Sequence, residues 1–138
     1  IHVFWDYENI KIPAGVDALF ACDCIRRVVE GFGNIVSRRL YYDSRKLSEA
    51  GLPRGDLDLA GFTLVDCPTR NQKETLDKKI IVDVMHEAML EVSHGGHPTI
   101  VLISSDGDFA YMLQRLRDVG VNVMVIHQQL TRTLLHSA

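Results

Sequence analysis

The feature that most constrains the fold is an unbroken apolar run that ends in two carboxylates, Thr99-Ile-Val-Leu-Ile-Ser-Ser-Asp-Gly-Asp-Phe-Ala. Pro98 precedes it, and a short run of β-branched and aliphatic residues is typical of a central parallel strand covered on both faces. In an open parallel sheet, the carboxyl ends of the strands line the crevice in which ligands bind. Asp106 and Asp108 are therefore expected at a functional edge of a sheet, and Asp108 is expected to open a helix.

A second short apolar run ends in the same way. Ile1-His-Val-Phe-Trp is followed by Asp6-Tyr-Glu-Asn9, so both of the strongest predicted strands carry a carboxylate at the tip. Because parallel strands bring their carboxyl ends to one edge of a sheet, Asp6 is expected near Asp106. Asn9 follows in the same loop, where it can form an Asx-turn.

The rest of the chain alternates strand and helix patterns. Further strands are predicted at 34–42, 62–65 and 121–126, and helices from Asp17 to Gly31, at about 74–92 and at 108–119. Residues 47–61 are expected to form short helical turns and a mobile loop, and 130–135 a terminal helix. Five strands alternating with helices predict an α/β fold, a three-layer αβα sandwich with a mostly parallel five-stranded sheet and right-handed crossovers.

Composition excludes several classes of protein. With 46% hydrophobic and 24% charged residues, we expect one globular domain over residues 1–138, excised from a longer multidomain protein. No apolar run approaches the roughly 18 residues that span a bilayer, which argues against a membrane protein. The formal net charge of -3 argues against passive, charge-driven binding of nucleic acid. Three cysteines give neither a disulfide framework nor a zinc ligand set, so we expect a reducing intracellular compartment, the cytoplasm rather than the nucleus or an organelle.

Asp77 is the third candidate acid because of its place on the helix predicted at about 74–92. At about 100° per residue, its side chain falls in the middle of the apolar stripe. A carboxylate directed at a core is costly unless a cation or several hydrogen-bond donors meet it. Since Asp77 lies in the first turn, it is expected at the rim of the sheet, where the amino end of the helix favours its charge.

Each acid also has a purely structural interpretation. Asp77 can satisfy helix-end amides, Asp108 can be the N-cap of its helix, and Asp6 can form an Asx-turn. Their conjunction at two strand ends and one helix end is harder to explain in this way, because like charges brought together raise one another's pKa unless a metal compensates them. The conjunction therefore favours metal binding.

Other residues are given lesser roles. Asp83 lies at the edge of the apolar stripe, four residues after Lys79, so a solvated helix pair explains it at least as well as a place behind the metal ligands does. His94 and His97 lack two further ligands and are interpreted as loop residues. Among the aromatic side chains only Tyr7 is considered as a ligand contact, and the others are expected in the core.

The three acid-bearing stretches together resemble the NYN domain of the PIN-like nuclease superfamily. Val3-Phe-Trp-Asp-Tyr-Glu-Asn9 followed by Ile12-Pro13 is similar to its first strand, and Asp77-Lys-Lys-Ile-Ile-Val-Asp83 to its acid-bearing helix. Ile103-Ser-Ser-Asp-Gly-Asp-Phe109 is similar to its Ser-x-Asp-x-Asp-Phe motif. The nearest likeness is to the limkain-type NYN domains of meiosis regulators of mRNA stability. The resemblance implies a PIN-like, Rossmann-like fold.

The resemblance further implies a metal-dependent endoribonuclease, a hydrolase that cleaves phosphodiester bonds in single-stranded or loop RNA. Mg²⁺ or Mn²⁺ is the implied cofactor, since hard cations prefer oxygen ligands and can activate water at a scissile phosphate. The implied metal ligands, which are also catalytic residues, are Asp6, Asp77, Asp106 and Asp108. Asn9 is the fifth implied catalytic residue and would orient a water or a phosphate oxygen, while Ser104 would donate a hydrogen bond at the rim.

RNA is the expected partner, together with other RNA-binding domains of the same parent chain. Contacts of basic side chains to phosphates fix the register of a nucleic acid and not its sequence. The basic residues expected to make them are Arg45, Lys46, Arg54, Arg70 and Lys73.

Two other functions stay open. Many NYN domains have a small glycine where this chain has Ser105, and this difference, with the acidic net charge, is compatible with an inactive NYN-like module that binds RNA or a protein partner. A receiver-like phosphoacceptor domain is suggested by Asp6 and Asp66, which end the first and third strands. Such a site needs an acid pair after the first strand and a lysine after the fifth, whereas this chain has His127 there.

Overall fold

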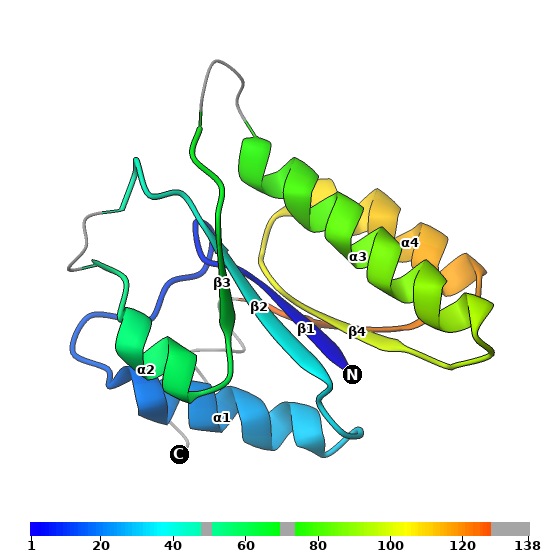
Figure 1. The fold of residues 1–138 in the computed structure, drawn as a ribbon, viewed down its shortest axis with the longest axis horizontal. Helices are drawn as coiled ribbons and strands as arrows, with labels where there is room; N and C mark the ends of the chain where they lie inside the picture. Colours follow the sequence, from blue (N-terminus) through cyan, green and yellow to red (C-terminus); the bar gives the residue numbers. More distant parts are fainter. Residues whose placement is uncertain (48–50, 70–73, 128–138) are drawn as a thin grey trace.

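The computed structural model describes residues 1–47, 51–69 and 74–127 and contains a five-stranded, all-parallel sheet (Figure 1). The strands are β1 (His2–Asp6), β2 (Ser37–Tyr42), β3 (Thr63–Asp66), β4 (Thr99–Ile103) and β5 (Asn122–Ile126). Their order is β3-β2-β1-β4-β5. This order differs from the 2-1-3-4-5 order of receiver-like domains, which removes that alternative.

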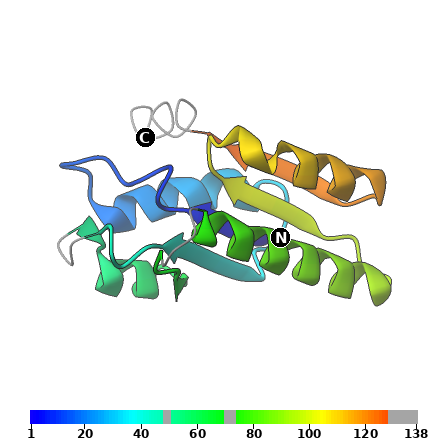
Figure 2. The same ribbon diagram turned by 90° about the horizontal axis from the view of Figure 1, so that it is seen from above.

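Helices cover both faces of the sheet, as Figure 1 shows, and Figure 2 gives the same arrangement from above. Helices α1 (Ala18–Glu30) and α2 (Arg54–Leu59) pack on one face, and α3 (Thr75–Ser93) and α4 (Ala110–Asp118) on the other, with the 3-10 turn η2 (Gly107–Phe109) leading into α4. The three-layer αβα architecture predicted from the sequence is confirmed. No helix in the described ranges is long and apolar enough to cross a membrane.

The central strand β1 shows why its sequence is apolar without alternation. Val3 and Trp5 pack into the core under α1 and α2, while Phe4 packs into the core under α3 and α4. All five residues of β1 are buried, so both faces of the strand require apolar side chains. The strand therefore delivers Asp6 to the sheet edge from a rigid support.

Most predicted elements lie within a few residues of the observed ones. Helix α3 spans 75–93 against the expected 74–92, and β2 begins at Ser37 instead of residue 34. The segment 47–61 contains one short helix, α2, in its described part. The predicted terminal helix at 130–135 lies outside the described residues.

Asp83 does not form the predicted solvated pair with Lys79. The Tyr41 hydroxyl donates to Asp83 Oδ2 at 2.6 Å, whereas Lys79 Nζ donates to the carbonyl of Asp66 at 3.3 Å. The helical wheel gave the direction of Asp83 correctly, at the edge of the apolar stripe, but it carries no information about which strand residue lies across from it. Asp83 is thus a structural acid between α3 and β2.

Two further acids of α3 repeat this arrangement one and two turns later. Arg39 Nη2 donates to Glu87 Oε1 at 2.8 Å, and His2 Nε2 lies 3.1 Å from Glu91 Oε1. His2 also lies 2.7 Å from Ser37 Oγ through Nδ1. We call this row the α3 seam. Its members are Asp83, Glu87, Glu91, Tyr41, Arg39, Ser37 and His2.

Candidate metal centre

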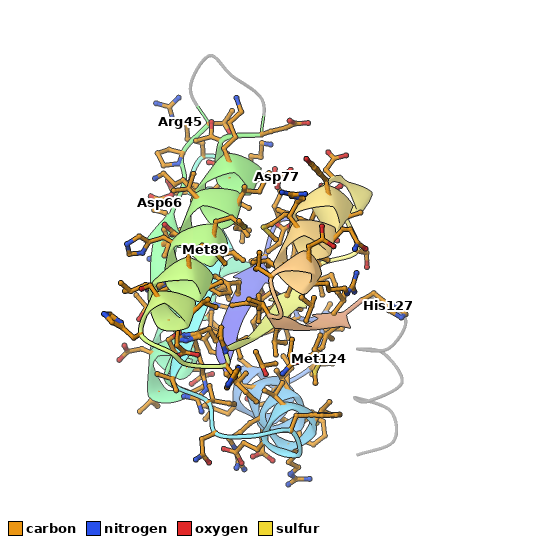
Figure 3. The ribbon with its side chains drawn as sticks, turned by 90° about the vertical axis from the view of Figure 1, so that its right-hand side faces the viewer. Arg45, Asp66, Asp77, Met89, Met124 and His127 are labelled. Atoms are coloured by element: carbon orange, nitrogen blue, oxygen red, sulfur yellow. The ribbon has the colours of Figure 1, made fainter. Side chains whose placement is uncertain are left out.

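Three predicted acids meet at the carboxyl edge of the sheet. Asp6 ends β1, Asp77 lies in the first turn of α3, and Asp106 follows β4. One carboxylate oxygen from each lies within 4.8 Å of the other two. Asp77 lies near the amino end of α3, in the space between α3 and α4 (Figure 3). The convergence that the sequence predicted is therefore present for these three residues.

Asp6 is buried and held in one orientation by hydrogen bonds. Ser104 Oγ donates to Asp6 Oδ2 at 3.0 Å, and the backbone N–H of Asn9 donates to Asp6 Oδ1 at 3.2 Å. Ser104 Oγ in turn accepts from the backbone N–H of Asp106 at 3.1 Å. The predicted hydrogen bond from Ser104 is confirmed, and this side chain also connects two of the three acids.

Asn9 connects the loops that follow β1 and β4. Its side-chain oxygen accepts the backbone N–H of Ser105 at 2.7 Å. The amide nitrogen of Asn9 and the second lone pair of its oxygen can still face a ligand while this contact persists. Asn9 lies beside the acids, as the sequence predicted, and its side-chain oxygen holds the two loops together.

Asp108 belongs to a second group of acids. The backbone N–H of Asp108 donates to Asp106 Oδ1 at 2.9 Å, which makes Asp106 the N-cap of η2. The structural alternative that gave this capping role to Asp108 is therefore wrong. The Asp108 carboxylate instead lies with those of Glu74 and Asp77, again within 4.8 Å of one another. Asp77 is common to both groups.

Glu74 was not identified from the sequence. It lies immediately before α3 with φ 69°, in the left-handed region. A helix brings residues three apart to the same side. The spacing between Glu74 and Asp77 was therefore the one feature of the sequence that could have placed Glu74 near the site. The left-handed conformation was not visible in the sequence, because glutamate rarely adopts it.

The pKa values of Asp6 and Asp77 are both raised, as expected for buried or partly buried acids that lie close to other acids. Burial, followed by the charges of Asp6 and Asp106, raises the pKa of Asp77 to about 7. Burial also raises the pKa of Asp6 to about 6, although hydrogen bonds from Ser104 and Asn9 act in the opposite direction. Carboxylates that repel one another at a sheet edge form an all-oxygen donor set that fits a hard divalent cation. The residues present therefore fit Mg²⁺ or Mn²⁺.

Asp43 shows that a strand-tip carboxylate need not belong to this site. It follows β2 and is buried, yet it accepts hydrogen bonds from the Thr69 N–H at 3.2 Å, from the Thr69 hydroxyl and from the Arg45 N–H at 2.9 Å. Although burial raises its pKa, these donors outweigh burial and hold the pKa below its ordinary value. Asp43 is satisfied by the protein itself.

Two of the predicted RNA contacts lie near the acids. Arg45 Nη1 donates to the carbonyl of Thr69 at 2.8 Å, and Lys46 Nζ pairs with Glu8 Oε1 at 2.5 Å. Figure 3 places Arg45 and Asp77 toward the same end of the molecule. Both basic side chains are exposed, so a phosphate can compete for them.

The remaining predicted RNA contacts are less directly placed. Arg54 Nη1 donates to the hydroxyl of Tyr42 at 2.9 Å, and its guanidinium stacks 4.9 Å from the centre of the same ring. Its observed contacts are therefore within the protein. Arg70 and Lys73 lie outside the described residues.

The structure excludes a ligand contact for Tyr7. Its side chain is buried, and its hydroxyl accepts the backbone N–H of Ile12 at 3.4 Å. It packs edge-on against Trp5 with ring centres 5.4 Å apart, so the loop after β1 folds back onto the core. His94 and His97 are exposed around the turn before β4 and belong to neither acid group.

Comparison with known proteins assigns the family. No curated protein gives a significant match. A crystal structure of a protein of unknown function from Vibrio parahaemolyticus is similar, with a TM-score of 0.69, 18% sequence identity, and coverage of 99% of this chain and 86% of that chain. That likeness supports the fold alone. The model of the NYN domain matches residues 1–138, and the chain therefore belongs to the NYN domain family.

Proposed function

We propose that this chain is a divalent-metal-dependent endoribonuclease that hydrolyses phosphodiester bonds in single-stranded or loop RNA. The NYN family is nuclease-like in general, which gives the reaction class. The observation that carries the proposal is the convergence of Asp6, Asp77 and Asp106 within 4.8 Å. Acids gathered in this way destabilise a protein unless a cation compensates them, and a phosphodiesterase needs such a cation.

The residues divide the work as follows. Asp6, Asp77 and Asp106 would hold the cation, and Asp108 would contribute through the group that it forms with Glu74 and Asp77. Bound there, Mg²⁺ or Mn²⁺ would activate a water and neutralise charge on the scissile phosphate. Ser104 and the backbone N–H of Asn9 keep the Asp6 carboxylate from rotating, so its oxygens face the site before any ligand arrives.

Asn9 and the basic side chains would position the RNA. With its oxygen bound by Ser105, the Asn9 amide nitrogen can donate to a phosphate oxygen or to a water. The phosphate contacts that we propose are made by Arg45, Lys46, Arg54, Arg70 and Lys73. We also propose a cytoplasmic location, further RNA-binding domains in the parent chain, and a limkain-type subfamily. The location rests on the cysteine content, and the other two proposals rest on the sequence motifs.

Cleavage of a fluorescent single-stranded RNA tests the function. The protein should produce internal cuts in Mg²⁺ or Mn²⁺ and none in EDTA, with single-stranded RNA cut faster than duplex RNA. Asp106→Asn is the variant of choice because an amide oxygen can still cap η2 while the charge is lost. It should cleave at least about 100-fold more slowly. Metal-independent cleavage would refute the proposal, and metal and RNA binding without cleavage would favour the inactive module.

A further inference from the structure

A cavity lies between α1, the residues that follow α2, and the amino ends of β1 and β2, on the face of the sheet opposite Asp77. Its volume is about 190 Å³, and its walls include Leu19, Cys22 and Phe62. Val3 and Arg38, which pair across β1 and β2, also line it. Val3 lies three residues before Asp6, roughly 10 Å along the strand. It faces the α1 side of the sheet, whereas Asp77 lies on the α3 side.

Arg38 is a charged residue of this cavity without a hydrogen-bonded partner in the described part of the chain. It is half-buried and makes no hydrogen bond or ion pair with any residue of the described ranges. Its guanidinium lies against Gly61, where an added Cβ would be 2.9 Å from Nη1. The other arginine of the wall, Arg26, is paired with Asp23 at 2.5 Å and with Glu30 at 2.9 Å. A partly desolvated guanidinium without a partner is unfavourable, and a carboxylate is the partner that it fits best.

The size of the cavity limits what can enter it. Sites for small-molecule ligands usually enclose about 300–1,000 Å³, so this one is too small for most of them and suits a single apolar side chain. Such a side chain in a pocket is the usual anchor of a protein interface. RNA could offer a phosphate to Arg38, but it has no aliphatic group for the apolar walls. The combination of an apolar pocket and an adjacent free guanidinium therefore selects a peptide.

We propose that this cavity is a docking site for a segment of a partner protein in which an apolar side chain is followed directly by an acidic one. The apolar side chain fills the space beside Leu19 and Phe62, and the carboxylate meets Arg38. Leu19 lines the cavity and is 41% exposed, so docking would cover an apolar side chain that is now in contact with solvent. The proposal stands on the α1 face alone and does not depend on nuclease activity.

Titration of the isotopically labelled 138-residue chain with small peptides tests it by NMR. Acetyl-Leu-Asp-amide should shift the amides of Arg38, Cys22 and Phe62 and leave Asp77 and Asp106 unshifted. Acetyl-Leu-Asn-amide should bind about tenfold more weakly, because it cannot form the charged hydrogen bonds. Acetyl-Ala-Asp-amide should also be weaker because it leaves the cavity unfilled. Equal binding of all three peptides, or shifts outside the cavity, would overturn the proposal.

Variants separate the charge from the fold. Arg38→Gln should bind the Leu-Asp and Leu-Asn peptides equally, and Arg38→Lys should retain part of the preference, since it keeps the charge but loses the planar fork. Arg117→Gln is the matched control, because Arg117 is an exposed arginine of α4 on the opposite face of the sheet. It should behave as the parent. If an oligouridylate or a higher protein concentration shifts the cavity amides while the peptides do not, the occupant is RNA or a second copy, and the proposal is wrong.

Discussion

Helix α3 carries acids in two contrasting situations. In its first turn, Asp77 faces Asp6 and Asp106, and burial and these charges raise its pKa to about 7. Further along the helix, Glu87 accepts a hydrogen bond from Arg39, and this contact, against the opposing effect of burial, holds its pKa below the ordinary value. The comparison shows that partial burial of an acid does not by itself mark a functional site. What marks the site is burial among other acids.

The α3 seam also helps to position Asp77 at the start of the helix. Asp83, Glu87 and Glu91 are each four residues apart, an advance of about 6.0 Å along a helix, while Tyr41, Arg39 and Ser37 of β2 are each two residues apart, about 6.6 Å along a strand. Tyr41 and Arg39 contact Asp83 and Glu87 directly, and Ser37 is connected to Glu91 through His2 of β1. The α3 seam therefore keeps nearly in step with β2 over two turns. This match fixes the position of α3 along the sheet and with it the height of Asp77 above Asp6.

The largest expected difference between the two regions is catalytic. Asp77→Asn should reduce kcat/KM for RNA cleavage in Mg²⁺ at least about 100-fold, since it removes a carboxylate common to both acid groups. Glu87→Gln should change it by less than about fivefold, because the rest of the α3 seam still positions the helix. Initial rates on a fluorescent RNA measure both. Equal losses of kcat/KM in the two variants would mean that Asp77 has no special role in cleavage compared with Glu87.

The next effect is on the pH dependence of stability without metal. Asp6 and Asp77 have pKa values of about 6 and about 7 when folded, against 3.8 as the ordinary value. The folded state thus binds more protons than the unfolded state at intermediate pH, so stability is lost as pH rises through 6 and 7. We expect the free energy of unfolding in EDTA to fall by roughly 2–4 kcal/mol between about pH 5 and pH 8.

Urea titrations at several pH values measure this change. Saturating Mg²⁺ should flatten or reverse the trend, because a cation favours the ionised carboxylates. Stability in EDTA that is constant or rises over this range would show that the acids are already compensated by the protein.

A substitution in the α3 seam should destabilise the protein. Glu87→Gln leaves the half-buried Arg39 guanidinium without its anionic partner and should lower the free energy of unfolding by roughly 1–2 kcal/mol. Urea unfolding at pH 7 measures it, with the response to Mg²⁺ expected to match that of the parent. A neutral effect would mean that the Arg39–Glu87 pair contributes as little to stability as an exposed ion pair does.

The matching substitution at the acid cluster should have the opposite sign. In EDTA, Asp77→Asn removes repulsion at constant side-chain size and should raise the free energy of unfolding by on the order of 1 kcal/mol. The rise in melting temperature that Mg²⁺ gives the parent should largely disappear in the variant. If Asp77 only served the helix end, the substitution would be neutral or slightly destabilising and the Mg²⁺ response would survive.

The smallest effect concerns the basic residues near the cluster. Replacing Arg45 and Lys46 together by Ala should weaken RNA binding and reduce the slope of log affinity against log salt by about one unit, with metal affinity nearly unchanged. Fluorescence anisotropy at several salt concentrations measures the slope. Replacing Arg115 and Arg117 of α4 by Ala gives a matched double control. An unchanged slope in the first variant would remove these two residues from the RNA interface.

Periodicity predicted the acids that lie where regular elements end. Asp6 and Asp106 follow apolar runs whose burial on both faces forces them to be central strands, and parallel strands place their ends together. The helical wheel directed Asp77 inward for the same kind of reason. These predictions needed only the pattern of apolar residues along a single strand or helix.

What the sequence did not reveal depends on contacts between elements. Asp83 contacts Tyr41 across the interface between α3 and β2, and a helical wheel of α3 carries no information about that strand. Tyr7 lies in the core because its loop turns back at Trp5. Glu74 joins the acids through a left-handed residue, a conformation that no sequence pattern predicts for glutamate.

The contact between Asn9 and Ser105 limits how related chains can vary in length. It bridges two loops that are 96 positions apart, and each loop starts directly from a central strand. An insertion in either loop would move one end of the bridge without the other. We expect insertions and deletions among related chains to gather instead at the opposite edge of the sheet, in the turns that lead into β2, β4 and β5, where none of the acids of the two groups lies. Length variation in an alignment would then outline the site even where the acids themselves had changed.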